Sequence, residues 1–190
     1  MSLVETLVGL VLLGLLAWIG LSALGLAGRA GAAVAADPAA VSSVQEVLRL
    51  RLASALPVML PAEGARPVPA FQGEPTRLRL VAELPPRFGV AGPALVEFAQ
   101  DGSSLRMAWR PLHGAAAGEG ARGRVLLDGV AAVALRYAGD PRGGHDLGWH
   151  AAWRDAAGLP LAVEFGVSFP SGDPRHWPPL VVAPRHAVPP

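Results

Sequence analysis

The sequence contains no cysteine and no lysine, and only 16% of its 190 residues are charged. Without cysteine the chain has no disulfide, no thiolate zinc site and no cysteine nucleophile. The absence of cysteine does not indicate whether the protein resides in an oxidising or a reducing compartment. All sixteen basic residues are arginines scattered after position 28, which is not the pattern of a nucleic-acid-binding segment. Ordinary soluble domains carry about 25% charged residues, so part of this chain is expected to avoid water.

The longest uncharged stretch runs for 23 residues, from Thr6 to Gly28. At about 1.5 Å per residue, a helix of this length spans a hydrocarbon core of roughly 30 Å. The apolar part of a signal peptide is only about 7–15 residues long and follows positive charge, whereas the only charge here is the preceding acid, Glu5. Residues 1–28 are therefore predicted to form a transmembrane helix, and the remainder leaves room for one domain of roughly 130 residues.

Glu5 lies at the start of this predicted helix, where an ionised carboxylate is costly unless a cation pairs with it. No arginine precedes Arg29, so the candidate cations are the α-amino group of Met1 and the amino terminus of a neighbouring subunit. Chemistry alone leaves a third reading open, in which Glu5 faces water at the membrane interface.

A second helix is predicted to begin at Asp37 and Pro38, which are typical of an N-cap and a first helical residue. Apolar residues then recur at spacings of three and four up to about Leu56, and Pro57 ends the helix. This stripe is expected to pack against a core. Its residues are Val41, Val44, Leu48, Leu52 and Ala55.

From Thr76 the apolar residues alternate with polar ones, which predicts half-buried strands. A turn at Gln100–Ser103 predicts a hairpin. The alternating segments are 76–84, 96–98, 105–110, 124–128, 130–137 and 161–169. We therefore predict an antiparallel, meander-like β domain over 76–183, joined to the helix by a proline-rich loop over 57–75. The proline-rich end, 170–190, is expected to be a tail with at most one short strand at Leu180–Ala183.

The sequence contains only weak signals of a metal-binding or catalytic site. His145, Asp146 and His150 could supply three metal ligands, but their spacing matches no closed zinc motif. The loop 139–144 has too few carboxylates for a calcium cage and is interpreted as a turn. No Gly-x-Ser-x-Gly elbow is present. We expect no catalytic residue, no metal site and no cofactor.

The stretch MSLVETLVGLVLLGLLA resembles the mature N-terminus of type IV pilins and pseudopilins. In that class a prepilin peptidase removes a short basic leader, and residue 1, here Met1, is N-methylated. The resemblance implies that Glu5 pairs with the N-terminal amine of an adjacent subunit during assembly. Met1 stands where the class usually has phenylalanine, and no leader precedes it, so we expect either the mature form or a reading frame that extends upstream.

The C-terminal half resembles one family of this class, the minor pseudopilin J family of type II secretion. The resemblance is carried by RVLLDGVAAVALRYAG, a loop with Trp149 and Trp153, and GLPLAVEFGVSF. It implies a pilin-like α+β fold, in which the transmembrane helix continues as a periplasmic spine over 29–56, with a kink near Gly31–Pro38, packed on an antiparallel β-sheet head over 76–183. Residues 184–190 would be a tail. The residues alone leave two readings for Trp149 and Trp153, packing on the head, which is favoured, or part of a partner surface.

The resemblance further implies a structural subunit of the pseudopilus tip that takes part in protein export across the outer membrane, and not an enzyme. Expected partners are minor pseudopilins of the I, K and H types, the major pseudopilin and the prepilin peptidase, without nucleic acid. The protein would cross the inner membrane once, with its C-terminal domain in the periplasm. Two alternatives stay open: a minor type IV pilin for adhesion or DNA uptake, and a bitopic protein with a periplasmic sensor or enzyme domain.

Overall fold

The computed structural model of the chain describes residues 38–61, 66–90, 92–112, 120–144, 147–154, 156 and 158–186. In this part of the chain no helix is long and apolar enough to cross a membrane. The predicted transmembrane helix over 1–28, and the spine up to Asp37 with its expected kink, lie outside the described residues.

Helix α2 (Pro38–Ala53) begins at the predicted proline but ends before the predicted Leu56. Residues 55 and 56 instead form strand β1 (Ala55–Leu56), which pairs with β5. Proline disfavours the helical conformation in the residue before it, so Pro57 acts on Leu56 and the helix stops earlier than its apolar pattern does. The stripe itself is confirmed: Val41, Val44, Leu48, Leu52 and Ala55 are all buried.

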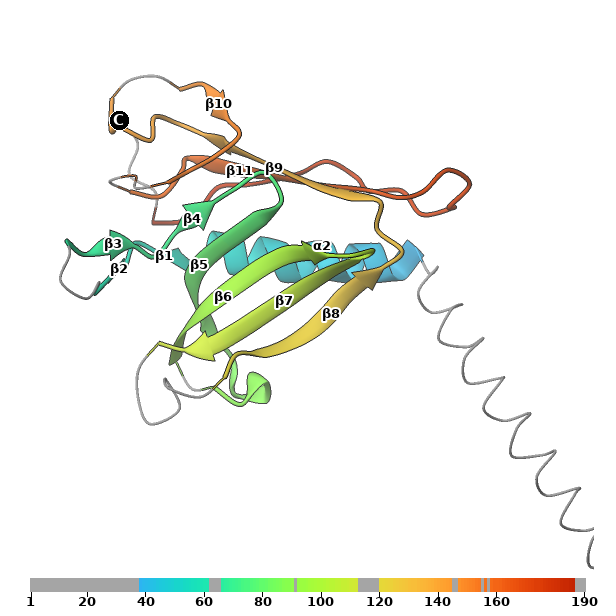
Figure 1. Cartoon of the computed structure of the whole chain (residues 1–190), viewed down its shortest axis with the longest axis horizontal. Helices are drawn as coiled ribbons and strands as arrows, with labels where there is room; N and C mark the ends of the chain where they lie inside the picture. The colour runs from blue at the N-terminus through green and yellow to red at the C-terminus, as the bar shows by residue number, and fades with distance from the viewer. Residues whose placement is uncertain are drawn as a thin grey trace, which may run out of the picture. The chain divides into compact units, whose positions relative to one another are not determined.

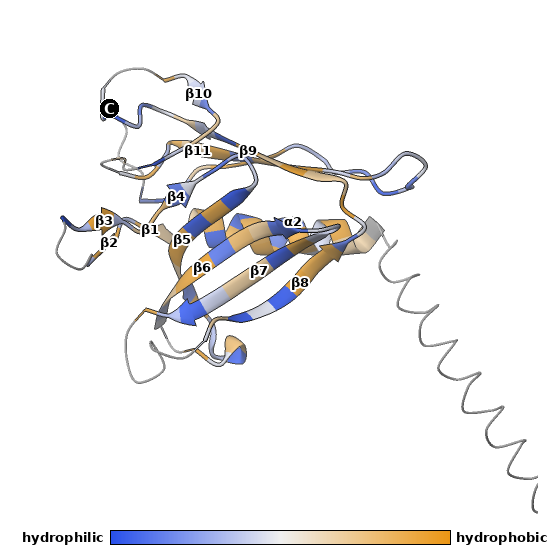
Figure 2. Ribbon diagram, viewed as in Figure 1, coloured by the Kyte–Doolittle hydropathy of each residue, from blue (hydrophilic) through white to orange (hydrophobic). Residues whose placement is uncertain are grey.

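The first sheet contains the predicted meander and has the strand order β1-β5-β6-β7-β8, with β4 also paired to β5. Its further strands are β4 (Gln72–Gly73), β5 (Arg77–Leu84), β6 (Gly92–Asp101), β7 (Ser104–Pro111) and β8 (Arg122–Asp128). The predicted hairpin is the β6–β7 pair, which turns at Gly102 and Ser103. Helix α2 covers one face of this sheet, and the alternation of apolar and polar residues appears as bands along its strands (Figures 1 and 2).

A second antiparallel sheet, with the order β10-β9-β11-β12, was not predicted as separate from the meander. Its strands are β9 (Ala132–Ala138), β10 (Trp149–His150), β11 (Ala162–Ser168) and β12 (Leu180–Val182). The chain leaves the first sheet after Asp128, at Gly129, whose φ of 68° lies in the region that only glycine adopts freely. The prediction of one meander was therefore wrong in topology and right in the antiparallel strands.

One core joins α2 to both sheets. Phe98 of β6 meets Phe165 of β11 edge to face, with the ring centroids 6.4 Å apart. Trp177 packs on Phe165 and donates its Nε1–H to the Phe165 carbonyl oxygen at 2.8 Å. The segment after Pro170 is thus not a loose tail, because it places Trp177 and strand β12 in the core.

The described residues of the proline-rich loop over 57–75 pack on the head and form short strands. The loop carries a short hairpin of β2 (Met59–Leu60) and β3 (Val68–Pro69), followed by β4. Ala70 and Phe71 are buried, and the backbone N–H of Ala70 donates to the Val58 carbonyl oxygen at 2.8 Å. The prolines of this segment leave room for only short strand pairings.

Candidate assembly surface

The residues predicted to act in assembly and N-terminal processing, Met1 and Glu5, lie outside the described residues. The described head contains the C-terminal motifs. Some of their side chains stabilise the head, and others are exposed at its surface.

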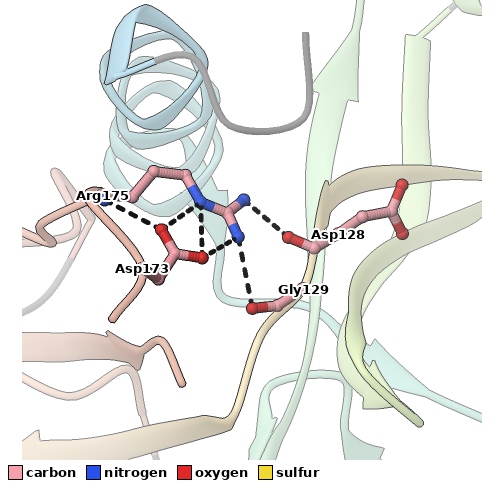
Figure 3. Close-up of polar contacts among 4 residues, drawn as sticks. All are labelled: Asp128, Gly129, Asp173 and Arg175. Atoms are coloured by element: carbon pink, nitrogen blue, oxygen red, sulfur yellow. Dashed lines mark hydrogen bonds and ion pairs between the residues drawn. The ribbon is translucent and has the colours of Figure 1, made fainter. Parts of the chain in front are cut away.

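Arg175 joins the C-terminal segment to the point where the chain changes sheets (Figure 3). Its guanidinium group donates to both carboxylate oxygens of Asp173, with a shortest distance of 2.6 Å. It also donates to the carbonyl oxygens of Asp128 and Gly129, at 2.6 and 3.3 Å, and its guanidinium carbon lies 4.3 Å from the Phe169 ring centroid. These charge-assisted hydrogen bonds hold the pKa of Asp173 below its usual value.

Gly129 in the LLDGV motif is explained by the same contacts. A Cβ atom added at this position would lie 2.6 Å from Nη2 of Arg175, and the positive φ would strain any L side chain. The glycine of this motif therefore has a structural role. It allows the backbone to pass from the first sheet to the second while Arg175 packs against it. Sequence reasoning missed Arg175, and its only local signal was the Asp-Pro-Arg spacing of residues 173–175.

Tyr137, the single tyrosine of the chain, is fully buried in β9 and donates its hydroxyl to the Glu74 carbonyl oxygen at 2.9 Å. Burial raises the pKa of Tyr137, because the ionised phenolate would lose its hydration. The ring fills the space beside Gly73, where a Cβ atom would overlap it. The second sheet is thereby fastened to β4 of the first.

The two tryptophans of the predicted loop have different positions. Trp153 is buried and donates its Nε1–H to the Gly158 carbonyl oxygen at 2.9 Å, so its predicted packing on the head is confirmed. Trp149 is 42% exposed, and the guanidinium carbon of Arg136 lies 5.3 Å from its ring centroid. The packing prediction is wrong for Trp149, which lies on β10, one of the two edge strands of the second sheet, with the Arg136 guanidinium group over its ring.

One side of α2 packs on the first sheet and the opposite side faces away from it. We call this opposite side the helix face. Its exposed residues are Ala39, Ser42, Ser43, Glu46, Arg49 and Leu50. Leu50 is 46% exposed, and Val181 on the neighbouring strand β12 is 48% exposed. Helix and strand are tied together, since Gln45 donates to the Pro178 carbonyl oxygen at 2.7 Å and the Arg185 N–H donates to the Ala53 carbonyl oxygen at 3.0 Å.

The described residues contain no group of three side chains able to hold a metal ion. His150 is described, but the other two members of the weighed metal triad, His145 and Asp146, are not. The loop 139–144 does form a turn, with the Gly143 N–H donating to the Asp140 carbonyl oxygen at 3.0 Å. One pocket in the described part of the chain is lined by proline, glycine and apolar residues, namely Pro57, Val58, Met59, Pro69, Phe71, Ala156, Gly158 and Leu159.

No protein-family model matches the chain. It is 36% identical to type II secretion system protein J of Xanthomonas campestris pv. campestris over 150 residues, covering 74% of this chain and 70% of that protein. The chain belongs to the type II secretion system protein J family. It is accordingly a minor pseudopilin, as the N-terminal and C-terminal motifs predicted, and this favours secretion over the two alternatives.

The protein J fold has a counterpart among solved structures. A chain in the crystal structure of the GspK–GspI–GspJ complex from the type 2 secretion system of enterotoxigenic Escherichia coli superposes with a TM-score of 0.53. The match covers 70% of this chain and 90% of that chain, at 16% sequence identity. Such a likeness shows a shared arrangement of helix and antiparallel strands, which confirms the predicted α+β head.

Proposed function

We propose that this protein J family member is anchored in the inner membrane by residues 1–28 and assembles with other minor pseudopilins at the tip of a periplasmic pseudopilus. The observation that carries the proposal is the 36% identity to a type II secretion protein J over 74% of the chain. The shared fold with a chain from a complex of GspK, GspI and GspJ supports minor pseudopilins as the partners. Pseudopilins of the H type and the major pseudopilin would continue the assembly.

Helix packing supplies the assembly energy in this proposal. The helix face is exposed over most of α2 and carries Leu50, so a neighbouring helix can lie along it without displacing the core. Glu5, in the predicted membrane segment, would pair with the N-terminal amine of the adjacent subunit. Because an unpaired carboxylate is costly in the bilayer, this one pair would select the axial register. Prepilin peptidase would first have to free and methylate residue 1.

The protein would thus act as a structural subunit, through its surfaces and without a reaction of its own. Export across the outer membrane would depend on it because, in this proposal, the subunit is part of the pseudopilus tip complex that takes part in export. Loss of the protein should then stop export without changing the synthesis of the exported proteins.

The test is complementation in a host strain from which the gene has been deleted, with a tagged full-length chain and its upstream codons. We expect wild type to restore export and to recover other minor pseudopilins from detergent extracts, and Glu5→Leu to lose both. The matched control is Glu97→Gln on β6, away from the helix face, which removes an acid whose ion pair with Arg77 is 3.3 Å long and partly exposed. Export that is normal in the deletion strain, or partners retained by Glu5→Leu, would reject the proposal.

A further inference from the structure

Three arginine side chains from three different elements surround the ring of Phe88, which lies in the short helix η1 (Pro86–Phe88). Arg51 comes from the last turn of α2, Arg87 from η1 and Arg124 from β8. Their guanidinium carbons lie 5.7, 5.6 and 5.3 Å from the ring centroid, in that order. Attraction to the ring helps to hold three like charges together. We call these three residues the arginine cluster.

A fourth arginine extends the surface along β8. Arg124 and Arg122 pair with Met107 and Trp109 of β7, whose side chains are buried in the core that includes α2. Since opposed residues of an antiparallel pair project to the same face, both arginines leave β8 on the side of α2. Arg122 donates an Nη1 hydrogen bond to the Gly89 carbonyl oxygen at 3.0 Å. The cluster therefore lies where α2, η1 and an edge strand meet.

Among the described residues, no carboxylate forms an ion pair with the arginine cluster. Arg51 is only 8% exposed, and it donates to the Glu83 carbonyl oxygen at 2.7 Å. Its buried Nε has no hydrogen-bond partner within the described part of the chain. Burial lowers the pKa of Arg51, and the charges of Arg87 and Arg124 lower it further. A buried cation without a counter-ion costs free energy, so within the described head the arginine cluster lacks the charge compensation that an acidic partner would supply.

The cluster opens to solvent through Arg87 and Arg124, which are both exposed. A guanidinium group fits a carboxylate through two parallel hydrogen bonds, so charge complementarity selects an acidic occupant. We propose that the arginine cluster is a docking site for an acidic segment of a neighbouring minor pseudopilin. This proposal rests on the proposed function and adds the chemistry of one contact in the assembly.

Docking would neutralise charges that repel one another in the free subunit. Two consequences separate this role from a merely structural one. Recovery of neighbours with the wild-type chain should fall as the salt concentration rises from about 50 mM to about 500 mM, because salt screens exposed charges. Neutralising Arg87 and Arg124 should leave the stability of the free protein unchanged or higher, whereas structural residues would lower it.

The first test is recovery of other minor pseudopilins by the tagged full-length chain from its host. We expect Arg87→Gln/Arg124→Gln to reduce recovery about tenfold, the equivalent of one lost charge-assisted contact. The control, Arg110→Gln/Arg142→Gln, removes the same charge at two exposed arginines elsewhere on the head and should recover neighbours as wild type does.

The second test uses the absence of lysine from the sequence. Arg87→Lys or Arg124→Lys keeps the charge and places a single side-chain amine in the cluster, which a carbodiimide joins to a carboxylate in direct contact. We expect a cross-link to Asp or Glu of another minor pseudopilin, mapped by mass spectrometry, and none from Arg110→Lys.

Two results would overturn the docking site alone: equal recovery by the cluster and control variants, or a cross-link only within the chain, for example to Glu119, or to a second copy. If the wild-type chain itself recovers no other minor pseudopilin, the proposed function fails and the docking site fails with it. The two failures are therefore distinguishable in one experiment.

Discussion

Gly73 and Trp153 exchange two backbone hydrogen bonds of 2.8 Å, which tie the tryptophan loop to strand β4 of the other sheet. Gly73→Ala would force a Cβ atom into the ring of Tyr137 at this junction. Overpacking of this kind costs about 1–3 kcal/mol. We expect a lower urea midpoint for the full chain in detergent, followed by tryptophan fluorescence. Gly120→Ala, whose added Cβ would have no described atom within 4 Å, is the control, and an equal effect there would contradict the explanation.

Tyr137→Phe removes only the hydroxyl that donates to Glu74, which should reduce the free energy of unfolding by about 1 kcal/mol at pH 7. Burial raises the folded pKa of Tyr137 above its unfolded value, so its contribution is complete below about pH 10 and is lost as the pH rises through the folded pKa. The deficit of the variant should therefore shrink in alkaline urea titrations. A deficit that is constant above pH 10 would show that burial of the phenol is not the cause.

Asp173→Asn should make unfolding less dependent on pH in acid. The hydrogen bonds from Arg175 lower the folded pKa of Asp173, so the pair stabilises the head above the unfolded pKa of about 4 and fades as the pH falls through the lower folded value. Melting temperatures between about pH 2 and pH 7 measure this. Asp101→Asn, which breaks an exposed pair with Arg106, is the control and should change little. Equal pH profiles of wild type and Asp173→Asn would refute the assignment.

Gly129→Ala should destabilise the head by about 1–3 kcal/mol, since it combines a positive φ with crowding against Arg175. Gly143→Ala isolates the first of these costs, because Gly143 has a φ of 75° and its added Cβ would meet no atom of the described residues within 4 Å. The difference between the two variants in chemical denaturation therefore measures the crowding. Equal destabilisation by the two variants would mean that the Arg175 side chain moves away from the added Cβ without a cost in free energy.

The strands were predictable because their signal is local. Leu78 and Leu80 face the core and Arg77 faces solvent within one short segment. The buried face of the strand can therefore be recognised from a few consecutive residues. The apolar stripe of α2 was readable for the same reason. The end of α2 was misplaced because Ala55 is buried in a strand as well as it would be in a helix, and periodicity does not distinguish the two.

The division into two sheets could not be read locally. It depends on which strands pair across long sequence separations, such as β9 with β11, and on a single positive φ at Gly129. The contacts of Arg175 and of the arginine cluster are hidden for the same reason, since Arg51 and Arg124 are brought together only by the packing of α2 beside β8. Family resemblance identified the role of the chain but not these contacts.

Processing and assembly as a pseudopilin are tested most directly by the N-terminal mass of the membrane-bound protein, expressed in its host with its upstream codons. We predict a polypeptide that begins at residue 1 of this sequence, cleaved from a leader and carrying one methyl group on its α-amine. That amine would then be the partner of Glu5 in the neighbouring subunit. An unprocessed, unmethylated terminus would contradict the assembly mechanism, since Glu5 would then lack the N-terminal amine proposed as its partner.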